Sequence, residues 1–386
     1  MSLATPDGSV ASLPRVDLVN EPTPLHELPR FADFLRAEAA SAGNRGPATV
    51  LMKREDLMPF GLGGNKLRSL EYVVGDALAQ GATDLLAGGR PQANHCRLVA
   101  ATAARCGLSA HVILAGPPQR PRGANEAMMN LLGAQVTHAT GSSAEERTEI
   151  MSRTAERLLG EGRRPYLVDA PLRGVPGSLG PMRAGLETAG QLAANGVIPS
   201  HIFVAVATGT TLAGLQAGFW RAGLRPRVVG VPTHLAGAPS GEAVADHVRT
   251  VVADLVALPV SDPAPAIDPP SDVELDSMSA WGEYAASSPG ATKAQVILAR
   301  AEGICVDPVY TARTIASVIG WSRIGRLSSA TVVIWNGGGM PALFESPRGP
   351  DRRSEPVVPA VDLRGEEAHP GRAESGRQQR GKFALG

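Results

Sequence analysis

Short apolar runs alternate with stretches of helical spacing over most of this 386-residue chain. An apolar run at residues 49–53 predicts a strand, and apolar positions recurring every three or four residues from Leu67 to Leu78 predict a helix after it. The alternation continues to residue 168, with strands expected at 84–87, 110–114, 135–137 and 165–168 and helices at 97–106, 125–132 and 144–159. This βαβα order predicts an α/β fold with parallel-rich twisted sheets and helices on both faces.

A second alternating run fills much of the remaining chain. Helices are expected at residues 182–195, 212–221 and 311–324, and strands at 201–207, 228–231 and 330–335. A chain of this length, in which 43% of residues are hydrophobic, can bury ample core, so we expect a globular, two-lobed protein.

Three segments have a less regular pattern. Two prolines hold Glu21 to Leu25 extended, and we expect this stretch to lie across the surface. Residues 232–270 contain one predicted helix at 244–255 and a connecting loop at 259–270. The stretch 347–386 has too little apolar surface to offset its ordering entropy, which predicts a disordered C-terminal tail.

Composition narrows the classes of partner and site. The formal net charge is zero and no basic block stands out in the body, which argues against nucleic acid and membrane partners and for a small molecule. No leader pattern or apolar run of about 18 residues is present, so a soluble, cytoplasmic protein is expected. The 3 cysteines and 8 histidines have no metal-ligand spacing, so reduced thiols and no metal are expected.

The glycine-rich turn at residues 61–68 delivers Lys66 to the start of a predicted helix. The field of a helix N-terminus disfavours an ammonium group and lowers its pKa, as Schiff-base chemistry requires. A solvated lysine beside a flexible loop is the alternative. Lysine is scarce here, however, and the others (Lys53, Lys293 and Lys382) occur at a charged strand end, in an alanine-rich helix and in the tail. Lys66 is therefore the candidate for covalent chemistry.

Loops that follow strands at the carboxyl edge of a parallel sheet are the expected ligand site. The loops that qualify are 88–95, 207–214 and 335–341. The first carries the polar side chains of Gln92, Asn94 and His95, although Asn94 could simply cap a helix. The second, with Gly and Thr at a helix start, suits a phosphate, although a plain turn is the alternative. Three glycines in the last suggest backbone crowded by a ligand or a neighbouring loop.

Two tyrosines flank these loops in a chain poor in tyrosine. Tyr310 directly precedes the predicted helix at 311–324, and Tyr284 lies close to Trp281. Their hydroxyls are candidates for acid/base groups, and core packing with a satisfied hydroxyl is an equally good interpretation.

A series of motifs, in order along the chain, resembles one enzyme family. The motifs are Pro22-Thr23-Pro24-Leu25, Lys53-Arg54-Glu55-Asp56-Leu57, Gly63-Gly64-Asn65-Lys66, Gln92-Ala93-Asn94-His95-Cys96-Arg97, Glu302-Gly303, Asp307-Pro308-Val309-Tyr310-Thr311 and Pro341-Ala342-Leu343-Phe344. They resemble the D-cysteine desulfhydrase and 1-aminocyclopropane-1-carboxylate (ACC) deaminase family of pyridoxal-phosphate (PLP) enzymes. The resemblance implies fold type II, the tryptophan synthase β-like fold. It further implies a large cofactor-binding domain of residues 1–66 and 173–346, a small domain of 67–172, and a homodimer.

The resemblance also implies roles for individual residues. Lys66 would be the Schiff-base lysine, and Tyr284 and Tyr310 would be catalytic tyrosines. The remaining cofactor-binding residues would be Asn94, Thr208, Gly209, Thr210, Thr211, Thr311 and Gly338, and those facing a small amino-acid substrate would be Gln92, Ala93 and His95. His95 and Thr311 look like the desulfhydrase branch. A threonine beside the pyridine nitrogen leaves that nitrogen unprotonated, which suits β-elimination.

Several positions depart from the family pattern. Ala93 replaces a serine whose hydroxyl contacts the substrate carboxylate or transfers a proton, Asn336 begins a motif that usually reads His-Thr-Gly-Gly, and residues 172–177 replace a Gly-Ser-Asn-Pro-Leu-Gly turn. Three functions therefore stay open. They are a lyase catalysing β-elimination or deamination of a small amino acid, including ACC deaminase; a β- or γ-replacement transferase; and a PLP-binding protein without catalysis.

Overall fold

The computed structural model describes residues 13–118, 122–141, 143–233, 241–258, 265, 267–276 and 289–344. All of these belong to one compact unit that spans Met1–Glu355. The predicted catalytic Tyr284, most of the predicted loop at 259–270 and the predicted tail lie outside the described residues.

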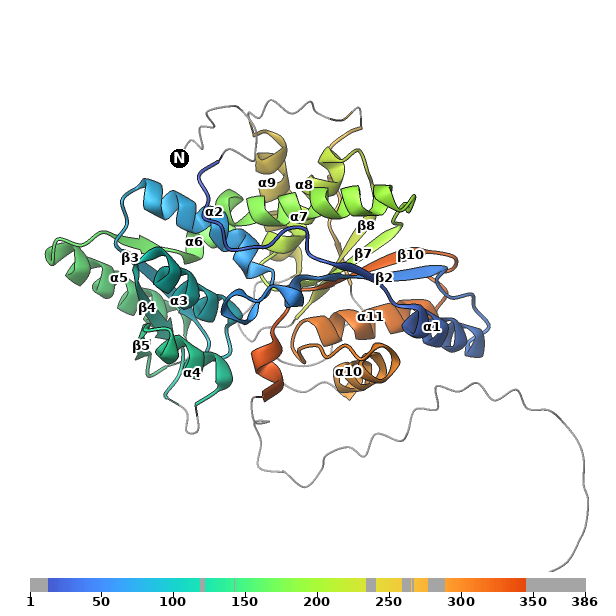
Figure 1. Cartoon of the computed structure of the whole chain (residues 1–386), viewed down its shortest axis with the longest axis horizontal. Coiled ribbons are helices and arrows are strands. Elements are labelled where there is room, and N and C mark those ends of the chain that lie inside the picture. The colour runs from blue at the N-terminus through green and yellow to red at the C-terminus, as the bar shows by residue number, and fades with distance from the viewer. Residues whose placement is uncertain are drawn as a thin grey trace, which may run out of the picture. The chain divides into compact units, whose positions relative to one another are not determined.

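The larger of two sheets combines strands from both ends of the chain (Figure 1). Its order is β1 (Leu25–Glu27), β2 (Thr49–Arg54), β10 (Thr331–Asn336), β7 (His201–Val206), β8 (Arg227–Pro232) and β9 (Glu274–Leu275). Only the edge pair β1 and β2 is antiparallel among these neighbours. Parallel neighbours bring the carboxyl ends of β2, β10 and β7 to one edge, where the loops at Lys66 and residues 207–214 and 335–341 follow them.

The smaller sheet is built from one continuous part of the chain. Its order is β5 (Gln135–His138), β4 (Ser109–Leu114), β3 (Asp84–Gly89) and β6 (Pro165–Leu167), and every pair is parallel. The strands agree with the predicted strands to within two residues at each end. The parallel-rich α/β architecture predicted from the hydrophobic pattern is therefore confirmed.

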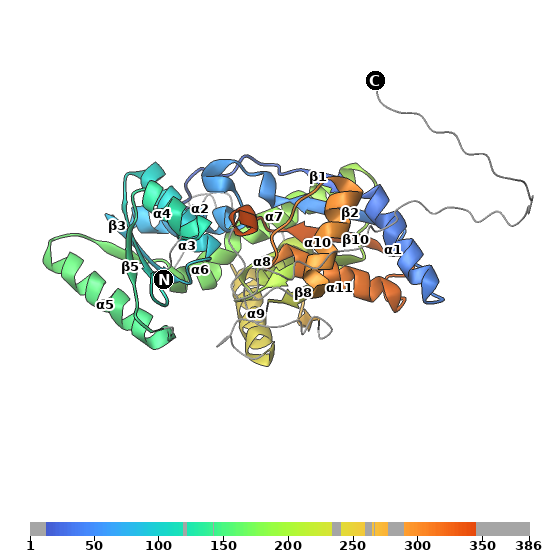
Figure 2. The ribbon, with the colours of Figure 1, turned by 90° about the horizontal axis from the view of Figure 1, so that it is seen from below.

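Helices cover both faces of the larger sheet (Figures 1 and 2). On one face lie α7 (Val175–Ala194), α8 (Thr210–Arg221) and α9 (Gly241–Val256), and on the other lie α1 (Pro29–Ser41), α10 (Pro289–Glu302) and α11 (Thr311–Arg323). The smaller sheet is accompanied by α2 (Lys66–Ala79), α3 (Asn94–Cys106), α4 (Ala124–Leu131), α5 (Ala144–Gly160) and α6 (Asp169–Arg173). Short 3-10 turns occur at η2 (Glu55–Leu57), η3 (Phe60–Leu62) and η5 (Met340–Phe344).

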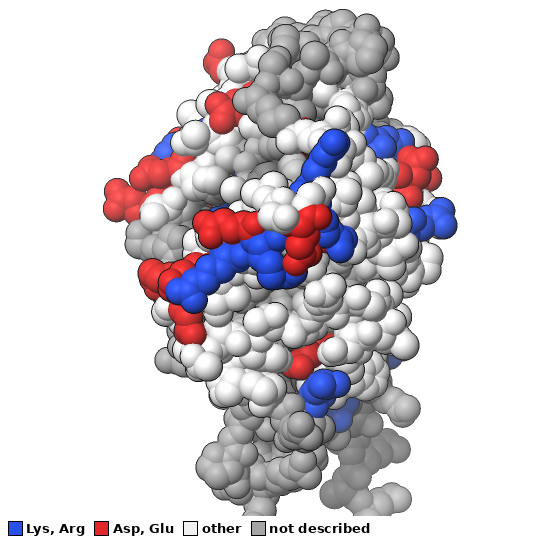
Figure 3. All heavy atoms as spheres, turned by 90° about the vertical axis from the view of Figure 1, so that its left-hand side faces the viewer, with Lys and Arg blue, Asp and Glu red and all other residues white. Residues whose placement is uncertain are grey.

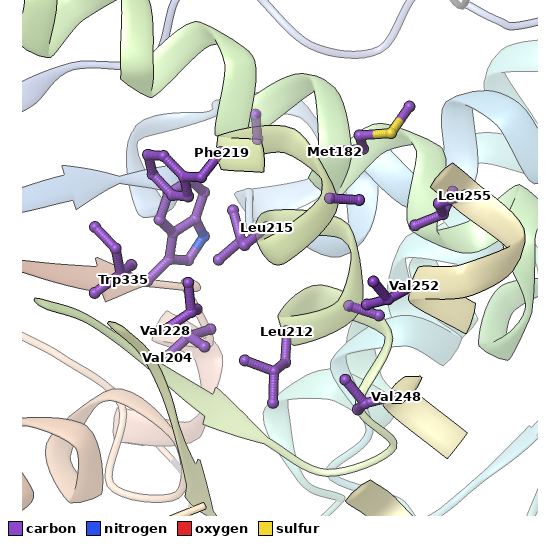
Figure 4. Close-up of a cluster of buried hydrophobic side chains, with 14 of the residues drawn as sticks. Met182, Val204, Leu212, Leu215, Phe219, Val228, Val248, Val252, Leu255 and Trp335 are labelled. Carbon is purple, nitrogen blue, oxygen red and sulfur yellow. The ribbon is translucent and has the colours of Figure 1, made fainter. Parts of the chain in front are cut away.

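The largest apolar core lies between the larger sheet and the layer of α7, α8 and α9. Figure 4 shows its side chains from all three helices and the strands: Met182, Val204, Leu212, Leu215, Phe219, Val228, Val248, Val252, Leu255 and Trp335. Burying each such aliphatic or aromatic side chain contributes about 1.5–3 kcal/mol. This core holds the beginning of α8 rigidly against the sheet.

Helix α7 begins earlier than predicted. We expected a turn at 172–177 and a helix from Met182, but α7 starts at Val175. Pro176 lies in the first turn, where its missing N–H has no helical partner, and the helix then continues through Pro181, directly before the predicted start. Glycines then allow close packing, since a Cβ on Gly180 would lie 2.0 Å from Arg68 O and one on Gly218 2.2 Å from Met182 O. Helix α7 thus anchors both α2 and α8.

The prediction that Glu21 to Leu25 lies across the surface is wrong at its centre. Thr23 is 2% exposed, and its hydroxyl donates to Glu55 at 2.7 Å. Arg68 of α2 donates to the same carboxylate at 2.7 and 3.0 Å, while Lys53 donates to Thr23 O at 2.9 Å and pairs with Glu187 of α7. Buried charges require such partners. The network ties the first turn of α2 to β2 and α7.

The face on the side of α5 carries charge of both signs. Figure 3 shows acidic and basic side chains interspersed there, and α5 itself contains the ion pairs Arg153–Glu149 and Arg157–Glu161. Interspersed charges give no strong field of one sign. The charges of the described residues on this face therefore do not favour a polyanion.

Candidate functional site

Lys66 is the first residue of α2 and is half-buried. Burial lowers the pKa of its amine to about 8. None of the carboxylates in the described part of the chain forms an ion pair with it. The direction of this shift agrees with the lowered pKa that the sequence suggested, and burial is its cause.

The turn before Lys66 packs against the glycines that follow β10. The Asn65 N–H donates to Gly337 O at 3.0 Å. A Cβ on Gly338 would lie 2.7 Å from the Cα of Gly64, and both glycines have positive φ, +86° and +118°. Any larger residue would clash with backbone and adopt a strained conformation. These glycines are thus crowded by a neighbouring loop, one of the two expected causes.

The threonine loop lies at the N-terminus of α8, next to the same turn. Asn65 Nδ2 donates to Thr211 Oγ1 at 3.1 Å, and the hydroxyls of Thr208 and Thr210 are 3.1 Å apart. Gly209 is the N-cap with φ +93°, and a Cβ there would lie 2.5 Å from Val248 Cγ2. Free N–H groups and the helix dipole favour an anion at such a terminus.

Asn94 brings the loop after β3 to the same place. It is the first residue of α3, and its Oδ1 accepts a hydrogen bond from Asn125 Nδ2 at 3.2 Å. Its Nδ2 lies 3.1 Å from the position that a Cβ on Gly339 would take. Asn94 thus reaches the glycine loop, and its side chain does not cap α3.

Thr311 and Asn336 form a buried pair beside these glycines. Thr311 Oγ1 donates to Asn336 Oδ1 at 3.1 Å, and the Gly338 N–H donates to the same oxygen at 3.2 Å. Asn336 Nδ2 is buried without a partner among the described residues. A buried unsatisfied amide is costly unless a ligand completes it.

Tyr310 stands at the N-cap of α11 and is half-buried. Asp307 holds this helix start, because its carboxylate accepts the N–H groups of Val309, Tyr310 and Thr311 at 2.9, 2.7 and 2.8 Å. Burial raises the pKa of Asp307 despite these bonds. The backbone that carries Tyr310 and Thr311 is therefore fixed.

The predicted substrate residues surround the start of α3. His95 Nε2 is 3.0 Å from Gly88 O, which makes that nitrogen the donor. Burial lowers the pKa of His95 against the pull of Asp169, and the charge of Lys66 lowers it further. Ala93 and Gln92 are 5% and 9% exposed. His95 is thus a neutral side chain within electrostatic reach of Lys66.

Sequence reasoning assigned no role to Arg97, Asn125 or the amide of Asn336. Arg97 is fully buried, and its signal in the sequence was its place at the end of the motif Gln92–Arg97, in which the arginine was given no role. Asn125 gave no signal, since a polar residue in the first turn of a helix is ordinary. The triple-glycine motif pointed to the neighbourhood of Asn336 but not to its orphaned nitrogen.

Among the described residues, no group of His, Cys, Asp and Glu could hold a metal ion, and Cys96, Cys106 and Cys305 are free thiols. None of the helices in the described ranges is long and apolar enough to cross a membrane. The groups gathered at the site are the Lys66 amine with its lowered pKa, the start of α8, which suits an anion, and the amides of Asn94 and Asn336.

Comparisons with known proteins identify relatives of this chain. The family described as "Pyridoxal-phosphate dependent enzyme" matches residues 16–338. A D-cysteine desulfhydrase of Yersinia enterocolitica is 31% identical over 87% of this chain and 96% of its own, and one of Serratia proteamaculans is 32% identical with the same coverage.

Solved structures have the same fold. A crystal structure of an ACC deaminase homologue superimposes with a TM-score of 0.70 at 29% identity, covering 87% of this chain and 94% of its own. A crystal structure of a threonine deaminase gives 0.54 at 23% identity, covering 82% and 92% of the two chains. The second likeness concerns the fold alone.

Proposed function

Because the chain belongs to the family of pyridoxal-phosphate dependent enzymes, we propose that it is a lyase that eliminates the β-leaving group of a small amino acid and releases ammonia and a 2-oxo acid. Relatives named D-cysteine desulfhydrase and a structural neighbour named ACC deaminase homologue support this reaction class. The observation that carries the proposal is Lys66, a half-buried amine with a pKa lowered to about 8 and no carboxylate partner in the described residues.

The described residues fit pyridoxal phosphate. The N-terminus of α8 offers free N–H groups and threonine hydroxyls to a phosphate, and Asn336 Nδ2 is a buried donor that lacks an acceptor. When bound, the cofactor supplies an electron sink for a carbanion at the substrate Cα. The protein must hold this group, exclude water and move protons around it.

Lys66 would hold the cofactor covalently through Nζ. An amine with a pKa of about 8 is neutral in about one molecule in ten near pH 7, whereas an ordinary lysine is neutral in fewer than about one in a thousand. The same amine, once released, would take the proton from the substrate Cα. Both roles need a neutral nitrogen, which burial provides.

The other cofactor contacts come from the loops that meet Lys66. We assign the phosphate to Thr208, Gly209, Thr210 and Thr211, and the ring to Asn94, Thr311 and Gly338. The Thr208–Thr210 contact and the Asn65–Thr211 bond hold the phosphate loop in place. The Thr311 hydroxyl donates to Asn336 Oδ1, which fixes its proton.

Substrate would face the start of α3. Gln92, Ala93 and His95 line this part, and the hydroxyl of Tyr310 or Tyr284 would donate a proton to the leaving group. We further propose a cytoplasmic homodimer with a discontinuous cofactor domain of residues 1–66 and 173–346 and a small domain of 67–172. The separate origin of the two sheets supports that division.

Borohydride reduction tests the attachment. The purified protein should be yellow, and reduction followed by peptide mapping should label Lys66. Lys66→Ala should lose the label, whereas the matched control Lys293→Ala, on α10, should keep it. A label on Lys53 or Lys293 in the wild type would overturn the assignment.

A substrate panel tests the reaction. D-cysteine, L-cysteine, D-serine and ACC are incubated with and without an added thiol. Ammonia with pyruvate or 2-oxobutyrate supports a lyase or deaminase. A thioether product would instead identify a replacement transferase, and a labelled protein without turnover a cofactor-binding protein.

A further inference from the structure

Arg97 is a buried cation without a counterion. Its side chain is fully buried in α3, and none of the ion pairs of the described residues includes it. Burial lowers the pKa of its guanidinium to about 10. Nε donates to Asn125 Oδ1 at 2.7 Å, Nη2 donates to Gly63 O at 3.2 Å, and Nη1 is buried without a partner.

These contacts fix the direction of two side-chain amides. A guanidinium only donates, so Asn125 must turn its oxygen to Arg97. Asn125 Nδ2 then points to the acceptors Gln92 O at 3.0 Å and Asn94 Oδ1 at 3.2 Å. The oxygen of Asn94 is thereby occupied, and its Nδ2 is left to face the glycine loop. The order of donors therefore follows from the fact that the guanidinium can only donate.

We propose that Arg97 and Asn125 are positioning residues that aim the Nδ2 donor of Asn94 at the cofactor. This inference rests on the proposed function. Among the described residues, none accepts a hydrogen bond from Asn94 Nδ2, so the group is available to an oxygen of a bound ligand. Without Asn125, the amide of Asn94 is free to present its oxygen, which repels an anionic oxygen of the ligand.

Arg97 couples this donor to the lysine turn. Its bond to Gly63 O reaches the residue three positions before Lys66. A Cβ on Gly63 would lie 2.3 Å from Met58 O, so this turn has little freedom to shift. The guanidinium of Arg97 therefore contacts both the turn that carries Lys66 and the side chain that orients Asn94.

Asn125→Asp is the sharpest test. The carboxylate keeps the size of the side chain and gives Arg97 a counterion, but it can donate neither to Asn94 Oδ1 nor to Gln92 O. Because Arg97 keeps a partner, the variant should still fold, while the dissociation constant for PLP rises about tenfold, as expected for loss of a hydrogen bond to a charged group. The visible absorption band should shift. Asn130→Asp, an exposed asparagine of the same helix, is the matched control and should change neither quantity.

A double-mutant cycle separates orientation from added charge. In an Asn94→Ala background, Asn125→Asp should weaken PLP binding less than about twofold, because the donor it directs is gone. Asn125→Ala should give the same pattern and serves if the aspartate variant does not fold.

The inference would be overturned if Asn125→Asp weakened PLP binding equally in the wild-type and Asn94→Ala backgrounds. It would also be overturned if the dissociation constant and the absorption band of Asn125→Asp were those of the wild type. If the wild type binds PLP at Lys66 but substitution of Asn125 leaves PLP binding unchanged, only this inference is wrong. A wild type without PLP on Lys66 removes the proposed function as well.

Discussion

Lys53 and Lys66, thirteen residues apart in the sequence, show how differently this fold surrounds positive charge. Burial lowers the pKa of both amines. At Lys53 the carboxylate of Glu187 opposes the shift, and Thr23 O and Gln191 Oε1 accept further bonds at 2.9 and 2.7 Å. At Lys66 no charge opposes it. The first lysine is a fully partnered part of the scaffold, and the second is chemically available.

The arginines near the two lysines differ in the same way, one having carboxylate partners and the other having none among the described residues. Arg68, near Lys53, is fully buried, and although burial opposes it, Glu55 and Glu187 raise the pKa of its guanidinium. Arg97, beneath the Lys66 turn, has no carboxylate, and burial lowers its pKa to about 10. Compensated charges stabilise a structure, whereas uncompensated donors are suited to a ligand. Variants of the two regions should therefore fail in different ways.

The scaffold should lose stability without losing chemistry. Glu55→Gln removes the charge that Arg68 meets at 2.7 Å. Leaving a buried charge uncompensated costs about 3–5 kcal/mol of unfolding free energy, and because Glu187 still pairs with Arg68 the loss here should be smaller, about 2–3 kcal/mol. Denaturant unfolding measures the loss, and turnover per folded molecule should persist.

Glu38→Gln is the control for that substitution. Glu38 meets Arg323 at 3.4 Å on the surface, where such a pair contributes about 0–1 kcal/mol. If both variants lost similar amounts of unfolding free energy, the buried network around Glu55 would stabilise the fold no more than a surface ion pair does.

The site should lose chemistry without losing stability. Tyr310→Phe keeps the ring and removes the hydroxyl, so we expect the rate constant to fall about 100-fold while cofactor occupancy and melting temperature hardly change. Steady-state kinetics with thermal unfolding decides this. Lower stability with normal turnover would instead make Tyr310 a packing residue, and the same pair of measurements would then apply to Tyr284→Phe.

A gain of function sharpens the contrast further. Ala93 is buried at the start of α3 and supplies no hydroxyl. If the pocket descends from a desulfhydrase, Ala93→Ser should raise elimination of D-cysteine by about 10- to 100-fold, the effect of one well-placed hydrogen bond of about 1–3 kcal/mol. An intact variant without any gain would indicate a pocket shaped for another substrate.

Much of this organisation was accessible from the sequence. Alternating strands and helices predicted the smaller sheet and the strands β2, β7, β8 and β10 of the larger one, but not its edge strands β1 and β9. The motifs around Lys66 and Asn94 predicted the family, the fold type and the cofactor, which the comparisons confirm. The residue roles, the domain boundaries, the homodimer and the cytoplasmic location stay predictions. The start of α7 was predicted wrongly at Met182, because the helix already begins at Val175 and runs through Pro181.

What the sequence did not indicate depends on contacts between distant segments. Thr23 is buried because Glu55, Arg68 and Glu187 surround it, and no periodicity encodes that meeting. The order of donors from Arg97 through Asn125 to Asn94 also depends on the packing of α4 against α3. The sequence shows which residues carry donors and charges. Only the folded structure shows which of these donors lack partners.

Titration of the Lys66 amine tests the contrast most directly. Cofactor-free protein is acetylated briefly over a pH series, and trypsin, which does not cut after acetyl-lysine, then reports modification of Lys66. The ammonium form is inert, so labelling should rise with pH as the neutral amine appears, with a midpoint of about 8. Lys53, fully buried among its partners, should stay unlabelled while the protein is folded. A Lys66 midpoint near the ordinary lysine value of about 10.4 would contradict the claim that burial without a counterion prepares this residue for covalent chemistry.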